Sequence, residues 1–375
     1  MANNDTMTPV LPNWLDPSPW LAQAHTATAA QVRSALEAEE PGEADLAALL
    51  SPAAEEFLEP MAESARDLTR RHFGRTISLF IPLYLSDYCS GGCRYCGFAS
   101  DRPRTRRALT MPDVAEELQA LKAMGFEEVL LLTGERTEQA DFPYLRDAVA
   151  LAAAPFHRVT LEAFPMPVEE YREIAAAGCT GVTLYQETYD PTQYEAMHRW
   201  GPKRDYLARL EAPERILGAA IRTAGMGVLL GLADPVFDAL ALFRHARYLR
   251  RRFWRSGITI SFPRICPQMG DFVPPNPVDE RFLVRLICAF RICLPDVPLV
   301  LSTRESAHFR DGIAGVGISK MSIASRTTVG GYQTQDEPPD GQFHVNDDRT
   351  VDAFCAMLRA KGLDPVFKDW DAVYR

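Results

Sequence analysis

The stretch that organises the chain is Tyr84-Leu-Ser-Asp-Tyr-Cys-Ser-Gly-Gly-Cys-Arg-Tyr-Cys-Gly-Phe98, which directly follows an apolar run. It places Cys89, Cys93 and Cys96 at C-x-x-x-C-x-x-C spacing. Three thiolates this close together, in a loop that contains glycines, are typical of a soft metal centre. A [4Fe–4S] cluster usually takes four cysteines, and no fourth lies nearby in the sequence. The spacing therefore predicts a cluster with one iron left open to a small molecule.

Other interpretations of these cysteines fit the spacing less well. A structural zinc site normally has four ligands, but no second C-x-x-C pair or pair of histidines follows. A ferredoxin-type electron carrier would need a fourth cysteine. Three cysteines without a metal would leave the flanking glycines and aromatic residues unexplained. The cluster with an open iron is thus the favoured interpretation.

Composition narrows the class of protein. The chain has 375 residues, 47% hydrophobic and 24% charged, which is ample material for a soluble core. Its net charge of −10 argues against a nucleic-acid or anionic-membrane partner. We see no secretory signal and no apolar run long enough to span a bilayer. The five other cysteines are scattered and form no disulfide framework, so a reducing cytoplasm is expected. They are Cys179, Cys266, Cys288, Cys293 and Cys355.

From Thr76 onward, apolar runs alternate with amphipathic segments, as in parallel strands joined by crossover helices. The predicted strands are Ile77–Leu85, Glu128–Leu132, Arg158–Ala163, Gly181–Gln186, Met226–Leu232, Gly257–Phe262, Pro298–Ser302 and Gly315–Ser322. The predicted helices between and after them are Met111–Met124, Tyr144–Ala154, Val168–Ala177, Pro213–Thr223, Val236–Trp254, Asp279–Cys293 and Asp348–Ala360. This pattern predicts an α/β fold, a TIM-like parallel barrel of eight strands. We expect three parts: an N-terminal helical extension (1–75), the barrel (76–323) and a C-terminal segment packed on it (324–375).

In such a barrel the carboxyl ends of the strands carry the active site. Residues that could contact a ligand lie at or just after most of these predicted ends, namely Gly134, Glu135, Glu162, Glu187, Arg264, Arg304 and Ser322. Each has a structural alternative: Arg304 beside Glu305 could form an ion pair, for example. The run Arg102, Arg104, Arg106 and Arg107 after the cysteines is either a solvated face or a surface that receives an acidic electron donor.

The cysteine spacing, with an aromatic residue before the third cysteine, resembles the radical S-adenosylmethionine (SAM) superfamily. From about residue 77 to 371 the chain also resembles the 2-iminoacetate synthases, the tyrosine lyases of bacterial thiamine biosynthesis. Besides the cysteine loop, the resemblance rests on Leu132-Thr-Gly-Glu135, Leu184-Tyr-Gln-Glu-Thr-Tyr189, Ser261-Phe-Pro-Arg264, Ser302-Thr-Arg-Glu-Ser306, Gly330-Gly-Tyr332, Asp347-Asp-Arg349 and Lys368-Asp-Trp-Asp371.

The resemblance implies roles for particular residues. Cys89, Cys93 and Cys96 would hold the [4Fe–4S] cluster, and Tyr95 would lie near the SAM adenine. Gly134 and Glu135 would take the methionine amino group of SAM. Glu187 would lie at the ribose hydroxyls, with Glu162 and Arg209 as further SAM contacts. Arg304, with Ser322 and Tyr84, resembles the clamp that holds the substrate carboxylate and amino group in aromatic amino-acid lyases.

The implied reaction is cleavage of the Cα–Cβ bond of L-tyrosine to p-cresol and 2-iminoacetate. The implied partners are a thiazole synthase subunit and a flavodoxin- or ferredoxin-type reductant. Three alternatives stay open at this point. One is a tryptophan lyase of peptide-antibiotic biosynthesis, which the tail residues disfavour. The second is the hydrogenase-maturation tyrosine lyase, whose additional C-terminal cysteine triad is absent from this sequence. The third is a non-catalytic iron–sulfur protein, which would have full cysteine ligation and no SAM pocket.

Overall fold

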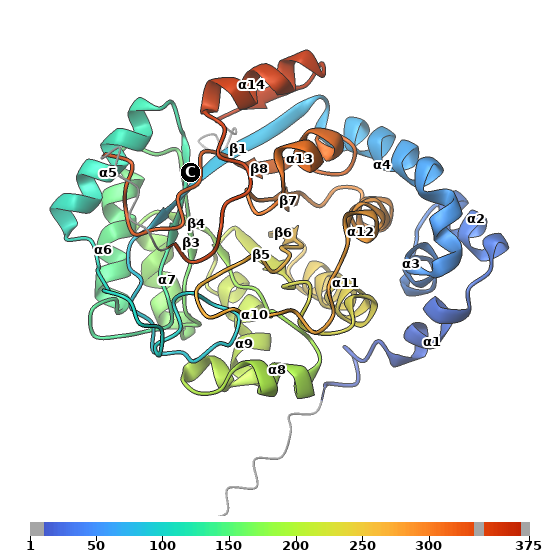
Figure 1. The fold of residues 1–375 in the computed structure, drawn as a ribbon, viewed down its shortest axis with the longest axis horizontal. Coiled ribbons are helices and arrows are strands. Elements are labelled where there is room, and N and C mark those ends of the chain that lie inside the picture. Colours follow the sequence, from blue (N-terminus) through green and yellow to red (C-terminus); the bar gives the residue numbers. More distant parts are fainter. Residues whose placement is uncertain (1–10, 334–340, 369–375) are drawn as a thin grey trace, which may run out of the picture.

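The fold was analysed in a computed structural model, which describes residues 11–333 and 341–368. Eight parallel strands close into a barrel in the order β2 to β8, then β1, which pairs back with β2 (Figure 1). The strands are β1 (Thr76–Tyr84), β2 (Glu128–Leu132), β3 (Arg158–Glu162), β4 (Cys179–Thr183), β5 (Thr223–Gly227), β6 (Gly257–Ser261), β7 (Leu299–Leu301) and β8 (Lys320–Ser322). The predicted fold class is therefore confirmed.

Three strands differ most from their predicted bounds. β4 begins at Cys179 and ends at Thr183, and β5 begins at Thr223, which the sequence had placed in a helix. β8 begins only at Lys320, because the chain turns at Gly315 with a positive φ of 75°. In each case one apolar run covers both a strand and the buried loop that adjoins it, so the run does not mark where pairing starts or stops.

Helices surround the barrel on the outside. Between the strands lie α5 (Met111–Ala123), α6 (Phe142–Ala153), α7 (Val168–Ala176), α8 (Pro191–Met197), η2 (Pro202–Arg204), α9 (Tyr206–Leu210), α10 (Ala212–Gly218), α11 (Pro235–Arg252), α12 (Glu280–Cys293) and α13 (Ala307–Ile313). α5 begins with a side-chain cap: Thr110 Oγ1 accepts from the Asp113 amide at 3.3 Å. The connection from β4 to β5 is more broken than predicted, because Pro191, Pro202 and Pro213 each begin a new short helix.

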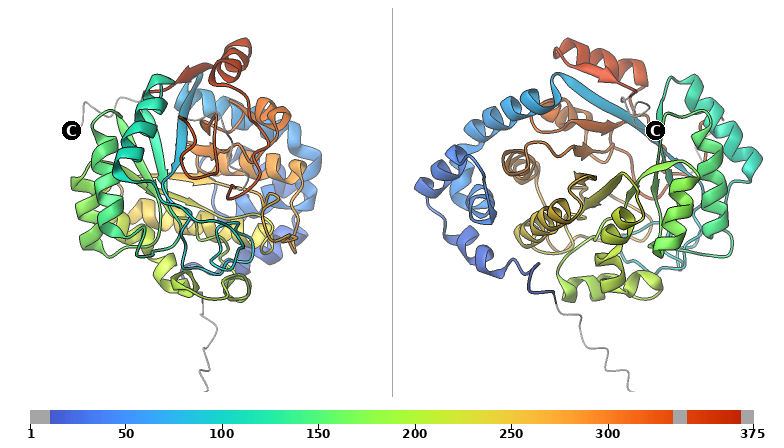
Figure 2. Two further views of the ribbon diagram at one scale, coloured as in Figure 1. Left: turned by 60° about the vertical axis from the view of Figure 1, so that its left-hand side comes forward. Right: turned by 180° about the vertical axis from the view of Figure 1, so that it is seen from behind.

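The N-terminal extension is helical, as predicted, and forms an outer layer beside α11 and α12, drawn in blue in Figures 1 and 2. It comprises α1 (Ser18–Thr26), α2 (Ala29–Glu37), α3 (Glu43–Leu50), η1 (Pro52–Phe57) and α4 (Leu58–Phe73). Trp14 anchors its start, since the indole stacks on Tyr248 of α11 at 4.3 Å between ring centroids. No helix among the described residues is long and apolar enough to cross a membrane.

The C-terminal segment does more than cover the barrel. After β8 the chain crosses the barrel mouth and forms α14 (Val351–Ala360), which the sequence predicted. A ninth strand, β9 (Asp364–Val366), follows and was not predicted. Ser78 of β1 pairs with Lys320 of β8 and also with Val366 of β9. β9 thus lies on the edge of β1 that β2 uses further along. The tail residues Asp369–Asp371 lie outside the described part of the chain.

Candidate active site

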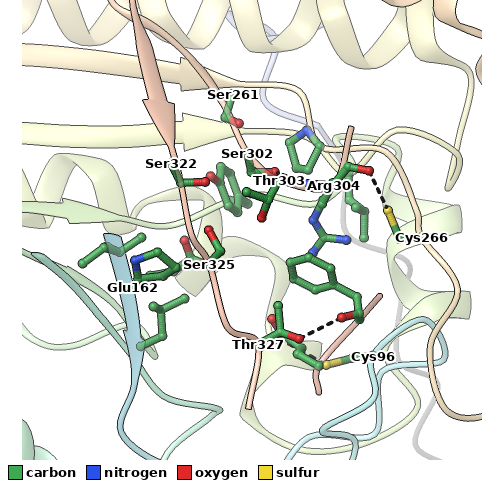
Figure 3. A pocket seen from close by; sticks show the side chains of 18 of the residues that line it. Cys96, Glu162, Ser261, Cys266, Ser302, Thr303, Arg304, Ser322, Ser325 and Thr327 are labelled. Atoms are coloured by element: carbon green, nitrogen blue, oxygen red, sulfur yellow. Dashed lines mark hydrogen bonds between the residues drawn. The ribbon is translucent and has the colours of Figure 1, made fainter. Parts of the chain in front are cut away.

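One pocket lies at the carboxyl ends of the barrel strands (Figure 3). It brings together most of the residues singled out from the sequence, namely Tyr84, Tyr95, Cys96, Glu162, Glu187, Arg304 and Ser322. Their positions in the chain span more than two hundred residues, and parallel strands bring their ends to one mouth. The convergence expected of a barrel active site is therefore present.

The cysteine loop surrounds its thiols with backbone donors. The Sγ of Cys89 accepts from the amides of Gly91 at 3.4 Å and Glu135 at 3.3 Å, and Cys96 Sγ accepts from Phe98 at 3.4 Å. Burial raises the pKa of Cys89 to about 11 and also raises the pKa of Cys93. A cationic centre would offset that burial, and N–H donors are what thiolates at such a centre accept.

The spacing of these thiols also bears on the kind of metal site. Among the described residues, no three Cys, His, Asp or Glu side chains are grouped so that they could hold one metal ion. In a [4Fe–4S] cluster each cysteine binds a different iron atom, so its thiolates stand further apart than the ligands of one ion. Three cysteine thiols on one loop, two of which accept from backbone amides, are the donor chemistry that a cluster takes.

The arginine run that follows the cysteines is largely taken up by the loop itself. Arg102, Arg104 and Arg106 donate to backbone carbonyls, for example Arg102 Nη2 to Arg94 at 2.7 Å and Arg106 Nη1 to Phe98 at 2.9 Å. Together they reach the carbonyl oxygens of Asp87, Arg94, Cys96, Gly97, Phe98 and Ala99. These three arginines brace the cysteine loop and are not a free solvated face.

Gly134 and Glu135 join the end of β2 to the cysteine loop. A Cβ on Gly134 would lie 2.6 Å from the Cβ of Cys89 and from the carbonyl of Tyr88, so only glycine fits. Glu135 Oε1 accepts from Arg209 Nη1 at 3.0 Å, whereas its buried Oε2 has no hydrogen-bond partner within the described ranges. A buried acceptor left open beside the cysteines is what an ammonium group of a ligand would fill.

Glu187 lies in a buried group of charges. Its carboxylate pairs with Lys203 Nζ at 2.5 Å and lies 3.7 Å from Arg209 Nη2. Burial alone would raise the pKa of Glu187, but these two cations hold it below its ordinary value. Lys203 Nζ also lies 5.7 Å from the ring centroid of Tyr95, whose hydroxyl is 2.7 Å from His198 Nε2. Tyr95 and Glu187 thus line the pocket, whereas Arg209 contacts Glu187 but is not one of the lining residues.

Glu162 differs from Glu187 in having no close cation. The described residues give its carboxylate no ion pair and no hydrogen bond, although it lines the pocket at the end of β3. Burial and the neighbouring charge of Glu187 raise its pKa to about 7, against the opposing influence of Arg304. It is therefore close to half protonated near neutral pH.

Arg304 carries a guanidinium that no carboxylate engages among the described residues. Glu305 instead pairs with Arg264, whose Nε donates to it at 3.0 Å, so the suspected pair of Arg304 with Glu305 does not form. The Arg304 guanidinium donates a long bond from Nη1 to the carbonyl of Arg264 at 3.4 Å and also contacts the Cys266 thiol. Ser322 and Tyr84 line the same pocket. An unpaired guanidinium there is able to take a carboxylate in bidentate fashion.

Several pocket residues were not found from the sequence, namely Lys203, Cys266, Thr327, Gln342 and Phe343. Lys203 follows a proline in a single 3-10 turn, and Gln342 and Phe343 lie in the C-terminal segment. None of them adjoins the end of a barrel strand, which was the only positional signal available.

Comparisons with known proteins agree with this geometry. Residues 83–243 match the model of the radical SAM superfamily, and residues 261–364 match the Biotin and Thiamin Synthesis associated domain. The chain is 42% identical to the 2-iminoacetate synthase of Escherichia coli K12 over 346 residues, 92% of each chain. It is 30% identical to the 3-methylornithine synthase of Methanosarcina acetivorans, over 86% of this chain and 89% of that one.

A solved structure is also similar over nearly the whole chain. The crystal structure of HydG, a maturase of the [FeFe]-hydrogenase, superposes with a TM-score of 0.91 at 30% identity, and covers 97% of this chain and 82% of its own. Methylornithine synthase PylB superposes with a TM-score of 0.70 at 20% identity, over 90% of this chain and 97% of its own, which bears on the fold alone.

Proposed function

Because the chain belongs to the 2-iminoacetate synthase family of radical SAM enzymes, we propose that it is a tyrosine lyase, which cleaves the Cα–Cβ bond of L-tyrosine. The products are p-cresol and 2-iminoacetate, the precursor of the thiazole moiety of thiamine. The observation that carries this proposal is 42% identity over 92% of the chain to a 2-iminoacetate synthase. The pocket supports it, since an unpaired arginine shares one barrel mouth with the cysteine loop.

We assign the cluster to Cys89, Cys93 and Cys96, and the methionine amino group of SAM to Gly134 and Glu135. Tyr95, Glu162, Glu187 and Arg209 are the candidate contacts for the rest of SAM. When bound, the cluster and SAM supply a 5′-deoxyadenosyl radical that takes a hydrogen atom from the substrate. The open Oε2 of Glu135 and the buried thiols fit these ligands.

We assign the binding of the tyrosine carboxylate and amino group to Arg304, Ser322 and Tyr84. The guanidinium of Arg304 has its donors available for a carboxylate, and a bidentate contact fixes the plane of the amino acid as well as its position. The pocket is lined by strand ends and by residues of the C-terminal segment. The chain's own contribution is thus to orient the amino acid at the barrel mouth.

The direct test is product identification. Anaerobically reconstituted protein is incubated with SAM, a reductant and either tyrosine or tryptophan, and the organic products are identified. We expect p-cresol from tyrosine and no indole product from tryptophan. Cys93→Ala should abolish SAM cleavage, whereas Cys288→Ala, a buried cysteine of α12, should not. SAM cleavage by Cys93→Ala at the wild-type level would refute the cluster assignment.

We further infer the partners and the location. An imine hydrolyses in water, so we expect direct transfer of 2-iminoacetate to a thiazole synthase subunit, and a flavodoxin- or ferredoxin-type protein as reductant. All eight cysteines are free, which suits a reducing cytoplasm. Co-purification with the thiazole synthase tests the first partner; normal thiazole formation with the two proteins held in separate chambers would argue against direct transfer.

A further inference from the structure

We propose that Gln342 and Phe343, two consecutive residues of the C-terminal segment, are positioning residues for the substrate clamp. Each contacts one clamp residue: Phe343 holds Arg304, and Gln342 holds Tyr84. This inference rests on the proposed function, because it takes Arg304 and Tyr84 as the residues that orient the amino acid. It adds residues that do not come from the barrel strands.

Phe343 supports the guanidinium of Arg304 from one side. The Cζ atom of Arg304 lies 3.4 Å from the centroid of the Phe343 ring, a cation–π contact. Besides the ring, the guanidinium contacts the Arg264 carbonyl through a 3.4 Å bond and the Cys266 thiol, and no carboxylate pairs with it among the described residues. A ring against its face leaves the donors at its edge available, and these are the donors that a bidentate carboxylate needs. The aromatic contact therefore fixes the plane in which the substrate carboxylate binds.

Gln342 orients the other side of the clamp. Its Oε1 accepts from the hydroxyl of Tyr84 at 2.8 Å, and its Nε2 lies 3.7 Å from Cys96 Sγ. The backbone of Gln342 accepts from the Gly97 amide at 3.3 Å. Gln342 therefore ties the Tyr84 phenol to the cysteine loop, so that the substrate end and the cluster end of the pocket are held at a fixed separation.

The segment that carries these residues is itself firmly attached. Asn346 Nδ2 donates to the carbonyl of Arg304 at 2.6 Å, and the Asn346 amide donates to Thr303 at 2.9 Å. Thr327 Oγ1 donates to the carbonyl of Phe343 at 2.8 Å, the bond drawn from Thr327 in Figure 3. Asn346 therefore bonds the backbone of Arg304, and Phe343 contacts its guanidinium, so the segment holds both ends of this residue.

The test uses the reconstituted enzyme with SAM and measures tyrosine KM, kcat, iron content and the ratio of 5′-deoxyadenosine to p-cresol. Phe343→Leu should raise tyrosine KM roughly three- to thirtyfold and raise that ratio, with unchanged iron content. Phe343→Tyr keeps an aromatic ring, so its tyrosine KM and its ratio of 5′-deoxyadenosine to p-cresol should equal those of the wild type. The control is His344→Ala, because His344 is exposed and only its backbone is bonded.

Gln342 is tested by a double-mutant cycle. If Gln342→Leu acts through Tyr84, the double variant with Tyr84→Phe should have the same tyrosine KM as Tyr84→Phe alone. Additive effects of the two changes would overturn this half of the proposal. Phe343→Leu with wild-type KM and coupling, or with loss of iron alongside the loss of affinity, would overturn the other half. If the wild-type enzyme makes no p-cresol, the proposed function fails, whatever the variants do.

Discussion

At the scale of single residues, Arg304 has no carboxylate partner among the described residues. Arg304→Lys should therefore leave the fold intact and weaken the binding of the substrate. Lysine keeps the charge but loses the planar fork. Loss of a charge-assisted bond of about 1.5–3 kcal/mol predicts a ten- to hundredfold loss of tyrosine affinity.

This change should also uncouple the reaction, so that 5′-deoxyadenosine forms without a matching amount of p-cresol. Steady-state kinetics with both products quantified measures the effect. Arg251→Lys serves as a control, because Arg251 is an exposed residue in the last turn of α11 and does not line the pocket at the barrel mouth. Normal affinity and coupling in Arg304→Lys would mean that another residue binds the carboxylate.

Glu162 predicts a pH dependence of stability. Its pKa is raised from 4.5 to about 7 in the folded chain, so between these values the folded chain binds more protons than the unfolded one. The stabilisation is fully present below 4.5 and is lost as the pH rises through 7. Glu162→Gln stays neutral throughout, so it should be more stable than wild type at about pH 8, by about 1–3 kcal/mol, and not near pH 4.5.

Denaturant unfolding at the two pH values checks this. A stability difference between Glu162→Gln and wild type that does not change with pH would show that the carboxyl titrates normally in the folded protein. Gln193→Leu in α8 is a suitable comparison, since only the backbone amide of Gln193 is bonded among the described residues, to Asp190.

At the scale of elements, the cysteine loop depends on the arginines that follow it. Arg106 donates to the carbonyls of Asp87, Phe98 and Ala99, so Arg106→Ala would leave three acceptors of the loop without a donor. We expect reconstituted Arg106→Ala to retain less than half the wild-type iron after gel filtration. The exposed neighbour Arg107 makes no such side-chain bond, and Arg107→Ala should retain iron normally. Equal iron content in the two variants would contradict the claim that the Arg106 side chain stabilises the cysteine loop.

At the scale of the whole molecule, the C-terminal segment is locked to the barrel by one buried ion pair. Arg310 of α13 and Asp347 are each 1% exposed and bonded to each other, and Arg310 also donates to the carbonyl of Ser322 at the end of β8. Asp347→Ala leaves Arg310 buried without its charge partner, which should cost about 3–5 kcal/mol of folding stability. Thermal or denaturant unfolding measures it, and Asp348→Ala, an exposed neighbour, should change little.

Much of this molecule follows from local sequence. Apolar runs and amphipathic segments predicted eight parallel strands, because a strand buried on both faces leaves a continuous apolar run and the helix that follows leaves an amphipathic period. The cysteine spacing predicted a [4Fe–4S] cluster, which membership of the radical SAM superfamily also implies, because all three candidate ligands lie on one short loop. Strand ends then identified Glu162, Arg304 and Ser322 as pocket residues, since a parallel barrel gathers these ends at one mouth.

Only the tertiary structure decided the rest. Three features depend on contacts between distant parts of the chain. Glu305 pairs with Arg264 and not with Arg304, Arg102, Arg104 and Arg106 bind the cysteine loop, and Gln342 and Phe343 line the pocket. The three residues of β9 are too few to show a period, and they form a strand because β1 offers them a free edge. Side-chain partners of this kind leave no periodic trace in the sequence, because the fold, and not the spacing of residues, brings them together.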